Sequence, residues 1–164
     1  MDDLETRLLG TDDWEVWRQL RLSALADAPD AFGATLAEER GFDEARWRRW
    51  LGDDDPQVLV LDGGRPVAIG AGYREETDGA APRLHVIAMW TDPAYRGRRL
   101  AAQVLTALVE WAAPRDLDLA LDVAIGNTAA RRSYEAFGFV RTGAARPLRD
   151  GSPVLVEEMV LRRG

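Results

Sequence analysis

The sequence contains no cysteine and no lysine, and its single histidine is His85. The absence of cysteine excludes disulfide bonds, thiolate ligands for metals and any covalent intermediate on a thiol. One histidine cannot form a histidine cluster, although carboxylates alone could still bind a hard cation. We therefore expect a protein without a metal centre.

Long apolar runs are also absent. No stretch reaches the roughly 18 apolar residues that a membrane-spanning helix needs, and residues 1–10, MDDLETRLLG, are acidic rather than typical of a secretory signal. The net charge of −7 opposes nonspecific binding to nucleic acid, because the phosphate backbone is negative as well. These features predict a cytoplasmic protein with no membrane or nucleic-acid partner.

The composition that remains is typical of a folded domain. The chain has 164 residues, of which 46% are hydrophobic and 30% are charged, and we expect one domain over residues 1–164. In the first half of the chain, apolar periodicity and turn residues predict a strand at 5–9, a helix from Asp12 to a break at 27–33 and a helical region at 35–51. Three strands are expected next, at 57–62, 67–76 and 84–91. The second half is expected to contain a helix from Gly97 to Pro114, a strand at 117–125, a helix at 127–138 and a hairpin of 139–148 with 153–163. The order β-α-α-β-β-β-α-β-α-β-β predicts an α/β fold with a single mixed central sheet.

Local signals support several of these boundaries. Asp12 and Glu15 have the spacing of a capping box at the start of the first helix. Asn127 is the expected N-cap of the last helix, and Gly138 is its expected C-terminal stop. The apolar run LHVIAMWT, at 84–91, predicts a strand that is buried on both faces.

The segment DPAYRGRRLAAQ, at 92–103, places a glycine and three arginines where a helix begins. Free backbone N–H groups and the helix dipole favour an anion at such a helix start. Gly97 lets the backbone approach a ligand, and Arg96, Arg98 and Arg99 add positive charge. A phosphate or pyrophosphate is the natural ligand, although the segment could also simply cap a surface helix. A P-loop is excluded by the absence of lysine.

Two motifs make the chain resemble the GNAT N-acyltransferase superfamily. The acyl-CoA loop of that family, R-x-x-G-x-G/A, matches Arg96, Gly97, Arg98, Arg99, Leu100 and Ala101. A second family pattern, N-x-x-A-x-x-x-Y-x-x-x-G-F, matches Asn127, Ala130, Tyr134, Gly138 and Phe139. The sequence departs from the family at Arg99, where glycine is usual.

The resemblance implies that acetyl-CoA is the cosubstrate and that no metal takes part. It places the pantetheine arm on strand residues Met89, Trp90 and Thr91 and the pyrophosphate on the backbone of 97–101, with Asn127 and Ala130 as further contacts. A backbone N–H near Met89 or Trp90 would stabilise the oxyanion. Because there is no cysteine, we expect direct transfer in a ternary complex.

The resemblance also implies an acid and a base. Tyr134 matches the family's general acid, and its alternative role is that of a core aromatic. His85 and Asp122 are two candidate bases, and a chain of waters without a single base is a third possibility. Each candidate also has a structural alternative, because His85 could be a hydrogen-bonded core residue and Asp122 could pair with an arginine.

The acceptor side is expected to involve Phe32, Glu38, Trp47 and the turn at 146–152. We favour a small-molecule primary amine over a protein N-terminus or lysine as the acceptor. A domain that binds acyl-CoA as a sensor, without turnover, is a further hypothesis. A homodimer is possible by analogy with the family. A serine hydrolase is excluded, because G-x-S-x-G is absent.

Overall fold

The computed structural model describes residues 3–76 and 78–162, and one seven-stranded sheet with the strand order β1-β2-β3-β4-β5-β7-β6 runs through it. The strands are Leu4–Leu8 (β1), Gln57–Asp62 (β2), Arg65–Glu75 (β3), Arg83–Thr91 (β4), Asp118–Ala124 (β5), Val140–Pro147 (β6) and Leu155–Leu161 (β7). Neighbouring strands are antiparallel except for β4 and β5, which are parallel. The expected single mixed sheet and the expected element order are confirmed.

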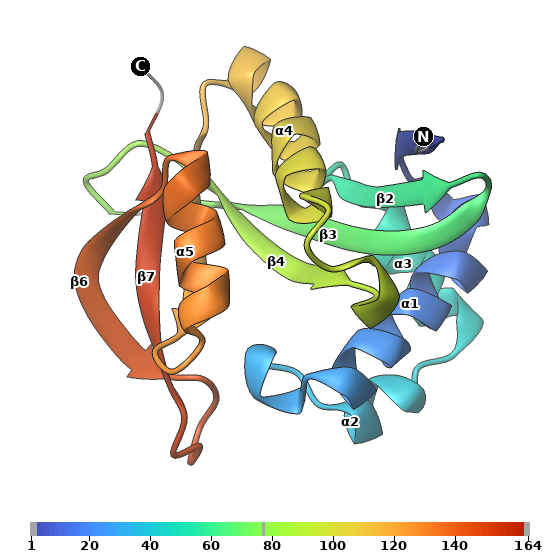
Figure 1. Ribbon diagram of the computed structural model, residues 1–164, viewed down its shortest axis with the longest axis horizontal. Coiled ribbons are helices and arrows are strands. Elements are labelled where there is room, and N and C mark those ends of the chain that lie inside the picture. The colour runs from blue at the N-terminus through green and yellow to red at the C-terminus, as the bar shows by residue number, and fades with distance from the viewer. Residues whose placement is uncertain (1–2, 77, 163–164) are drawn as a thin grey trace.

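Helices cover both faces of the sheet (Figure 1). Five α-helices are described: Trp14–Asp27 (α1), Leu36–Arg40 (α2), Glu44–Gly52 (α3), Leu100–Ala112 (α4) and Thr128–Phe137 (α5). The helical region expected at 35–51 is divided at Gly41, which ends α2, and α3 starts afresh because the side chain of Asp43 accepts a hydrogen bond from the backbone N–H of Arg46 at 2.8 Å.

The core is divided between the two faces, as alternation along β2 illustrates. Val58 and Val60 belong to the cluster under α4 and α5, whereas Leu59 belongs to the cluster under α1 and α3. Successive side chains of a strand point to opposite faces, so the consecutive apolar residues of β2 contribute to both parts of the core. Trp17 and Trp47 are fully buried in the second cluster.

The helix caps are partly as expected. Asn127 caps α5 by accepting a hydrogen bond from the N–H of Ala130 at 3.2 Å, and Gly138, with φ of 126°, ends it. The capping box expected from Asp12 and Glu15 is wrong. A turn of 3₁₀ helix precedes α1, so Asp13 becomes the N-cap residue and its carboxylate accepts from the N–H of Gly10 at 2.9 Å.

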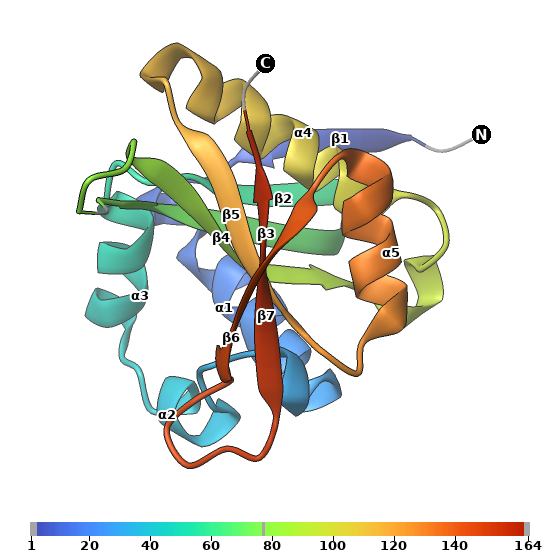
Figure 2. The same ribbon diagram turned by 90° about the vertical axis from the view of Figure 1, so that its left-hand side faces the viewer.

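The sheet is incomplete at its centre. The parallel strands β4 and β5 pair only from Arg83–Asp118 to His85–Ala120, although β5 continues to pair with β7 as far as Ala124 (Figure 2). Beyond His85, β4 contains a bulge at Ala88, which has a positive φ of 61°. A bulge bends its strand, so the two strands separate.

A glycine in β3 permits this bulge. A Cβ at Gly70 would lie 2.6 Å from the sulfur of Met89 and would also collide with Val104 of α4. Gly70 therefore lets the bulged part of β4 and the helix α4 approach the backbone of β3 together.

Candidate active site

A cavity of about 390 Å³ lies where β4 and β5 separate. Its walls come from β4, β5, α5, the segment after α1 and the β6–β7 hairpin. Its polar lining residues are Arg21, Tyr73, His85, Asp122, Asn127, Tyr134 and Arg146. The three residues predicted to carry acid or base chemistry, Tyr134, His85 and Asp122, are thus brought to one cavity.

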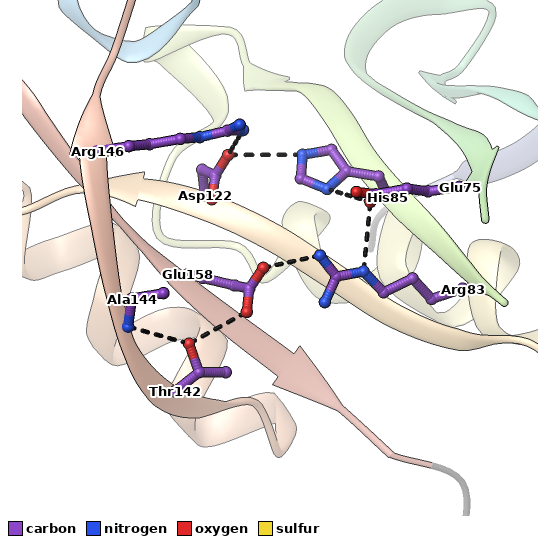
Figure 3. Close-up of polar contacts among 8 residues, drawn as sticks. All are labelled: Glu75, Arg83, His85, Asp122, Thr142, Ala144, Arg146 and Glu158. Carbon is purple, nitrogen blue, oxygen red and sulfur yellow. Dashed lines mark hydrogen bonds and ion pairs between the residues drawn. The ribbon is translucent and has the colours of Figure 1, made fainter. Parts of the chain in front are cut away.

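His85 lies between two carboxylates (Figure 3). Its Nε2 is 3.7 Å from Oδ2 of Asp122, and its Nδ1 is 3.4 Å from Oε2 of Glu75. The same oxygen of Asp122 forms an ion pair with the guanidinium of Arg146. The two candidate bases are therefore neighbours in one network, and Asp122 does pair with an arginine.

The network continues away from the cavity. Arg83 donates to Oε2 of Glu75 at 3.3 Å and to Oε2 of Glu158 at 2.8 Å. Thr142 donates to the other oxygen of Glu158 at 3.1 Å. A second cavity of about 100 Å³ borders this part of the network and also borders His85.

Burial shifts the pKa of two of these side chains. His85 is 6% exposed, and desolvation lowers its pKa below the ordinary value, while the charges of Asp122 and Glu75 act in the opposite direction. Desolvation also raises the pKa of Tyr134 to about 12. Tyr134 therefore remains a proton donor throughout the physiological pH range.

The arginine-rich loop lies outside the residues that line the cavity, at the start of α4. Arg96 is tied down from both sides, because it donates to the carbonyl of Thr91 at 3.2 Å and contacts Asp27 at 2.5 Å. The guanidinium of Arg98 lies 4.9 Å from the ring centre of Tyr95. Arg99 has φ of 61°, the left-handed region that favours glycine. The family glycine is replaced here, but its backbone conformation is retained.

The strand residues expected to contact acetyl-CoA have different positions. Met89 lines the cavity. Trp90 instead faces α1, where its indole N–H donates to Asp27 at 2.9 Å, and Thr91 is held by Arg96 through its carbonyl. Asn127 and Ala130 line the cavity from the start of α5.

The residues expected on the acceptor side are not all brought to the cavity. Phe32 lines it, but Glu38 is exposed on α2 and does not. Trp47 is fully buried and stacks on Trp50, with ring centres 5.8 Å apart, so it lies behind the cavity wall. The residue next to Glu38, Glu39, is the one that points inward.

Sequence reasoning missed the buried pair of Arg21 and Glu39. Arg21 lines the cavity, is 5% exposed and donates to both oxygens of Glu39, at 2.8 and 3.1 Å. Its guanidinium also lies over the ring of Phe32, at 5.1 Å. The sequence signal that could have identified Arg21 as buried is its position between Leu20 and Ala24, where a charged residue interrupts the apolar stripe of the helix.

The turn at 146–152 borders the cavity through Arg146 and Leu148. Arg149 donates to the carbonyl of Gly33 at 3.3 Å, of Pro29 at 3.1 Å and of Phe32 at 3.3 Å. These bonds join the β6–β7 hairpin to the segment between α1 and α2 (Figure 2). We call this set of contacts the Arg149 clasp. The part of the turn that was expected near the acceptor is therefore in contact with Phe32.

The described residues contain no group of three or more acidic, histidine or cysteine side chains placed to hold a metal ion. Within the same ranges, every helix is too short or too polar to cross a bilayer.

Comparisons with known proteins agree with this geometry. A model of the acetyltransferase (GNAT) family matches residues 17–139. A search of curated protein sequences finds no significant match.

Several solved structures share the fold. The structure of yncA from Salmonella typhimurium, with its cofactor acetyl-CoA, has a TM-score of 0.79 and 17% identity over 98% of this chain and 94% of its own. The aminoglycoside N-acetyltransferase AAC(6')-Iy, in complex with CoA, has a TM-score of 0.72 and 19% identity, and the match covers 88% of this chain and 92% of its own. A Salmonella typhimurium acetyltransferase that modifies the N-terminal serine of a 50S ribosomal subunit protein has a TM-score of 0.73 and 15% identity. This match covers 98% of this chain and 95% of its own.

The buried ion pair behind Phe32 gives a stability prediction. Replacing Glu39 with glutamine should lower the free energy of unfolding by about 3 kcal/mol, because the charge of Arg21 would remain buried without its partner. Chemical denaturation at neutral pH measures this change. Glu38→Gln, at the exposed neighbouring position, is the matched control and should change stability by less than about 0.5 kcal/mol. Equal effects of the two substitutions would show that the pair does not stabilise the fold.

Proposed function

We propose, since this chain belongs to the acetyltransferase (GNAT) family, that it transfers an acetyl group from acetyl-CoA directly to the primary amine of a small molecule. The observation that carries the proposal is the single cavity between β4 and β5, which brings together Tyr134, His85 and Asp122. A sensor that only binds acyl-CoA would need neither an acid nor a base in such a cavity.

The residues of the chain fit acetyl-CoA at two places. The bulge of β4 interrupts regular pairing at Ala88 and Met89, which makes backbone groups available for the pantetheine arm and the thioester oxygen. The start of α4 would hold the pyrophosphate on its N–H groups. Gly97 has a positive φ of 83° and open space where a Cβ would be, so the backbone can approach an anion there.

The three arginines of this loop have different roles. Arg96 is held by Asp27 and by the carbonyl of Thr91, so it fixes the loop to α1 and β4. Arg99 retains the left-handed conformation, so the backbone N–H groups after it can still face the pyrophosphate. Arg98 contributes positive charge at the same place.

Acetyl-CoA supplies a thioester carbonyl for attack by the acceptor amine. Tyr134 gives a proton to the departing sulfur, because its raised pKa of about 12 keeps the hydroxyl protonated until it is needed. The N–H groups near Met89 stabilise negative charge on the carbonyl oxygen. No side chain forms a covalent intermediate, which agrees with the absence of cysteine.

We assign the base to His85 rather than to Asp122. An ammonium must lose a proton before its nitrogen can attack. Oδ2 of Asp122 is occupied by an ion pair with the guanidinium of Arg146, so this oxygen is not free to contact an acceptor amine. Burial lowers the pKa of His85, so the imidazole is neutral and able to accept a proton at neutral pH.

The Arg149 clasp favours a small acceptor. It joins the β6–β7 hairpin to the α1–α2 segment, both of which contribute residues to the cavity wall, and so limits the space for an extended peptide between them. A small molecule fits within this partly open cavity of about 390 Å³, which is in the usual range for ligand pockets. The similar structures include enzymes for both acceptor classes, so the clasp is the observation that favours one of them.

An acceptor screen tests the proposal. The purified chain should release free CoA thiol from acetyl-CoA in the presence of a small primary amine. The screen holds polyamines, aminoglycosides, amino acids and short peptides with free N-termini or lysines. Release with peptides alone would identify a protein acetyltransferase instead. Bound acetyl-CoA without release by any acceptor would contradict a catalytic role and favour the sensor.

Opening the clasp should relax this selection. In Arg149→Ala the three bonds to the α1–α2 segment are lost, so kcat/KM for a short peptide should rise relative to the small amine, by about tenfold. The ratio of the two kcat/KM values measures the change. Arg49→Ala, which removes an exposed arginine on α3, should leave the ratio as it is. An unchanged ratio in Arg149→Ala would mean that the clasp does not select the acceptor.

Removing the hydroxyl of Tyr134 should slow the transfer. Tyr134→Phe should lower kcat by about 100-fold or more, because the sulfur leaves without a proton donor. The dissociation constant for acetyl-CoA, from calorimetry, should change little, since the aromatic ring remains. Turnover equal to that of the wild type would exclude Tyr134 as the acid.

A further inference from the structure

His85 lies between two carboxylates that belong to different strands. Glu75 comes from β3 and faces Nδ1, and Asp122 comes from β5 and faces Nε2 (Figure 3). A neutral imidazole carries one N–H and one lone pair. Only one of the two carboxylates can therefore accept its hydrogen bond, and the choice decides which nitrogen is free to take a proton.

The surroundings favour Glu75 as the acceptor. Its Oε2 is the nearer of the two oxygens, at 3.4 Å against 3.7 Å. Each of these oxygens also meets an arginine, but Oδ2 of Asp122 is in direct contact with the guanidinium of Arg146, whereas Nε of Arg83 lies 3.3 Å from Oε2 of Glu75. Nδ1 of His85 is buried and makes no hydrogen bond within the described residues, and a buried N–H without an acceptor is costly. The side chain of Glu75 is 31% exposed, so its carboxylate can adjust toward Nδ1.

We propose that Glu75 is a positioning residue, whose carboxylate keeps the proton of neutral His85 on Nδ1 so that Nε2 accepts the proton of the acceptor amine. This inference rests on the base assigned in the proposed function. When Nε2 takes the proton, one N–H bond of the ammonium breaks and its electron pair stays on the amine nitrogen. The resulting imidazolium lies between two negative charges, which stabilise it.

The other charged groups around His85 act in both directions. Arg146, from β6, and Arg83, from β4 itself, disfavour the imidazolium, as burial does. Glu158, from β7, attracts it. The ring of Tyr73, from β3, lies 5.1 Å from the imidazole. Three carboxylates, including that of Glu75, thus favour the imidazolium of His85, whereas burial and two arginines disfavour it.

The second cavity borders this network. It is lined by His85, Glu75 and Asp122 together with residues of β6 and β7, and its volume of about 100 Å³ is enough for water. Asp122 borders both cavities. Water in the second cavity would therefore lie beside Asp122, the carboxylate that faces Nε2.

Nuclear magnetic resonance tests the proposal directly, because His85 is the only histidine of the sequence and gives one set of imidazole signals. The nitrogen chemical shifts of the wild type at neutral pH should show the Nδ1–H tautomer. In Glu75→Gln the pKa of His85 should fall by about one unit, since a neighbouring negative charge is lost. The matched control, Glu76→Gln, removes an exposed carboxylate one residue along the chain and should leave this pKa unchanged.

Two results would overturn the proposal. One is an Nε2–H tautomer in the wild type, a measurement that needs no variant. The other is a pKa of His85 that is equal in wild type and Glu75→Gln. Both measurements are made without acetyl-CoA or an acceptor, so an absence of turnover would contradict only the proposed function.

Kinetics test the role of Glu75 in the reaction itself. The base must be neutral, so kcat/KM rises with pH through the pKa of His85. In Glu75→Gln this acidic limb should move to lower pH by the shift seen in the spectra, and the plateau should fall about tenfold, because a weaker base takes the proton. A limb that stays in place while the pKa of His85 moves would show that Glu75 does not act on the base.

Discussion

The separation of β4 from β5 is the constraint on which the rest of the structure depends. Two parallel strands that stayed paired would leave no space at the centre of the sheet, and the apolar side chains of both would simply form a core. Here pairing stops after His85 and Ala120, and the bulge at Ala88 directs β4 away. The exposed edges of the two strands then become the walls of a cavity, and β7 keeps β5 in place from the other side.

The charged residues around this gap compensate one another rather than standing alone. Asp122 is paired with Arg146, Glu75 and Glu158 with Arg83, and Arg21 with Glu39. Burying single charges at these places would be costly. The pairs allow titratable groups to sit beside a cavity in the middle of a sheet, where burial lowers the pKa of His85.

The loop at 96–101 shows that a residue other than glycine can adopt the left-handed conformation directly before α4. Arg99 stands where the family has glycine, yet it adopts the left-handed conformation that glycine would adopt. The helix α4 still begins directly after it, and Arg96 holds the preceding turn against α1 and β4. What an anion would meet at this place is the backbone, so the side chain of residue 99 matters less than its φ and ψ.

The sequence by itself determined the features that depend on neighbouring residues. Strand and helix order follow from periodicity, and the cap at Asn127 and the stop at Gly138 follow from local hydrogen bonding and glycine. The second family motif contains three residues that line the cavity, Asn127, Ala130 and Tyr134. The sequence also offered His85 and Asp122 as candidate bases, beside a chain of waters without a single base. Nothing in the spacing of these two residues could show that they belong to one network with Glu75 and Arg146. That depends on which residues face each other across β3, β4, β5 and β6.

Only the tertiary structure decided which helix side chains point inward and which residues far apart in the sequence come into contact. Glu38 and Glu39 are adjacent acidic residues, and a step of one residue turns a helix by about 100°, which sends Glu39 to Arg21 and Glu38 to solvent. Trp47 lies on the inner side of α3 for the same reason. The Arg149 clasp joins residues more than 100 positions apart, and a contact of that kind exists only once the sheet has brought the hairpin and the helices together.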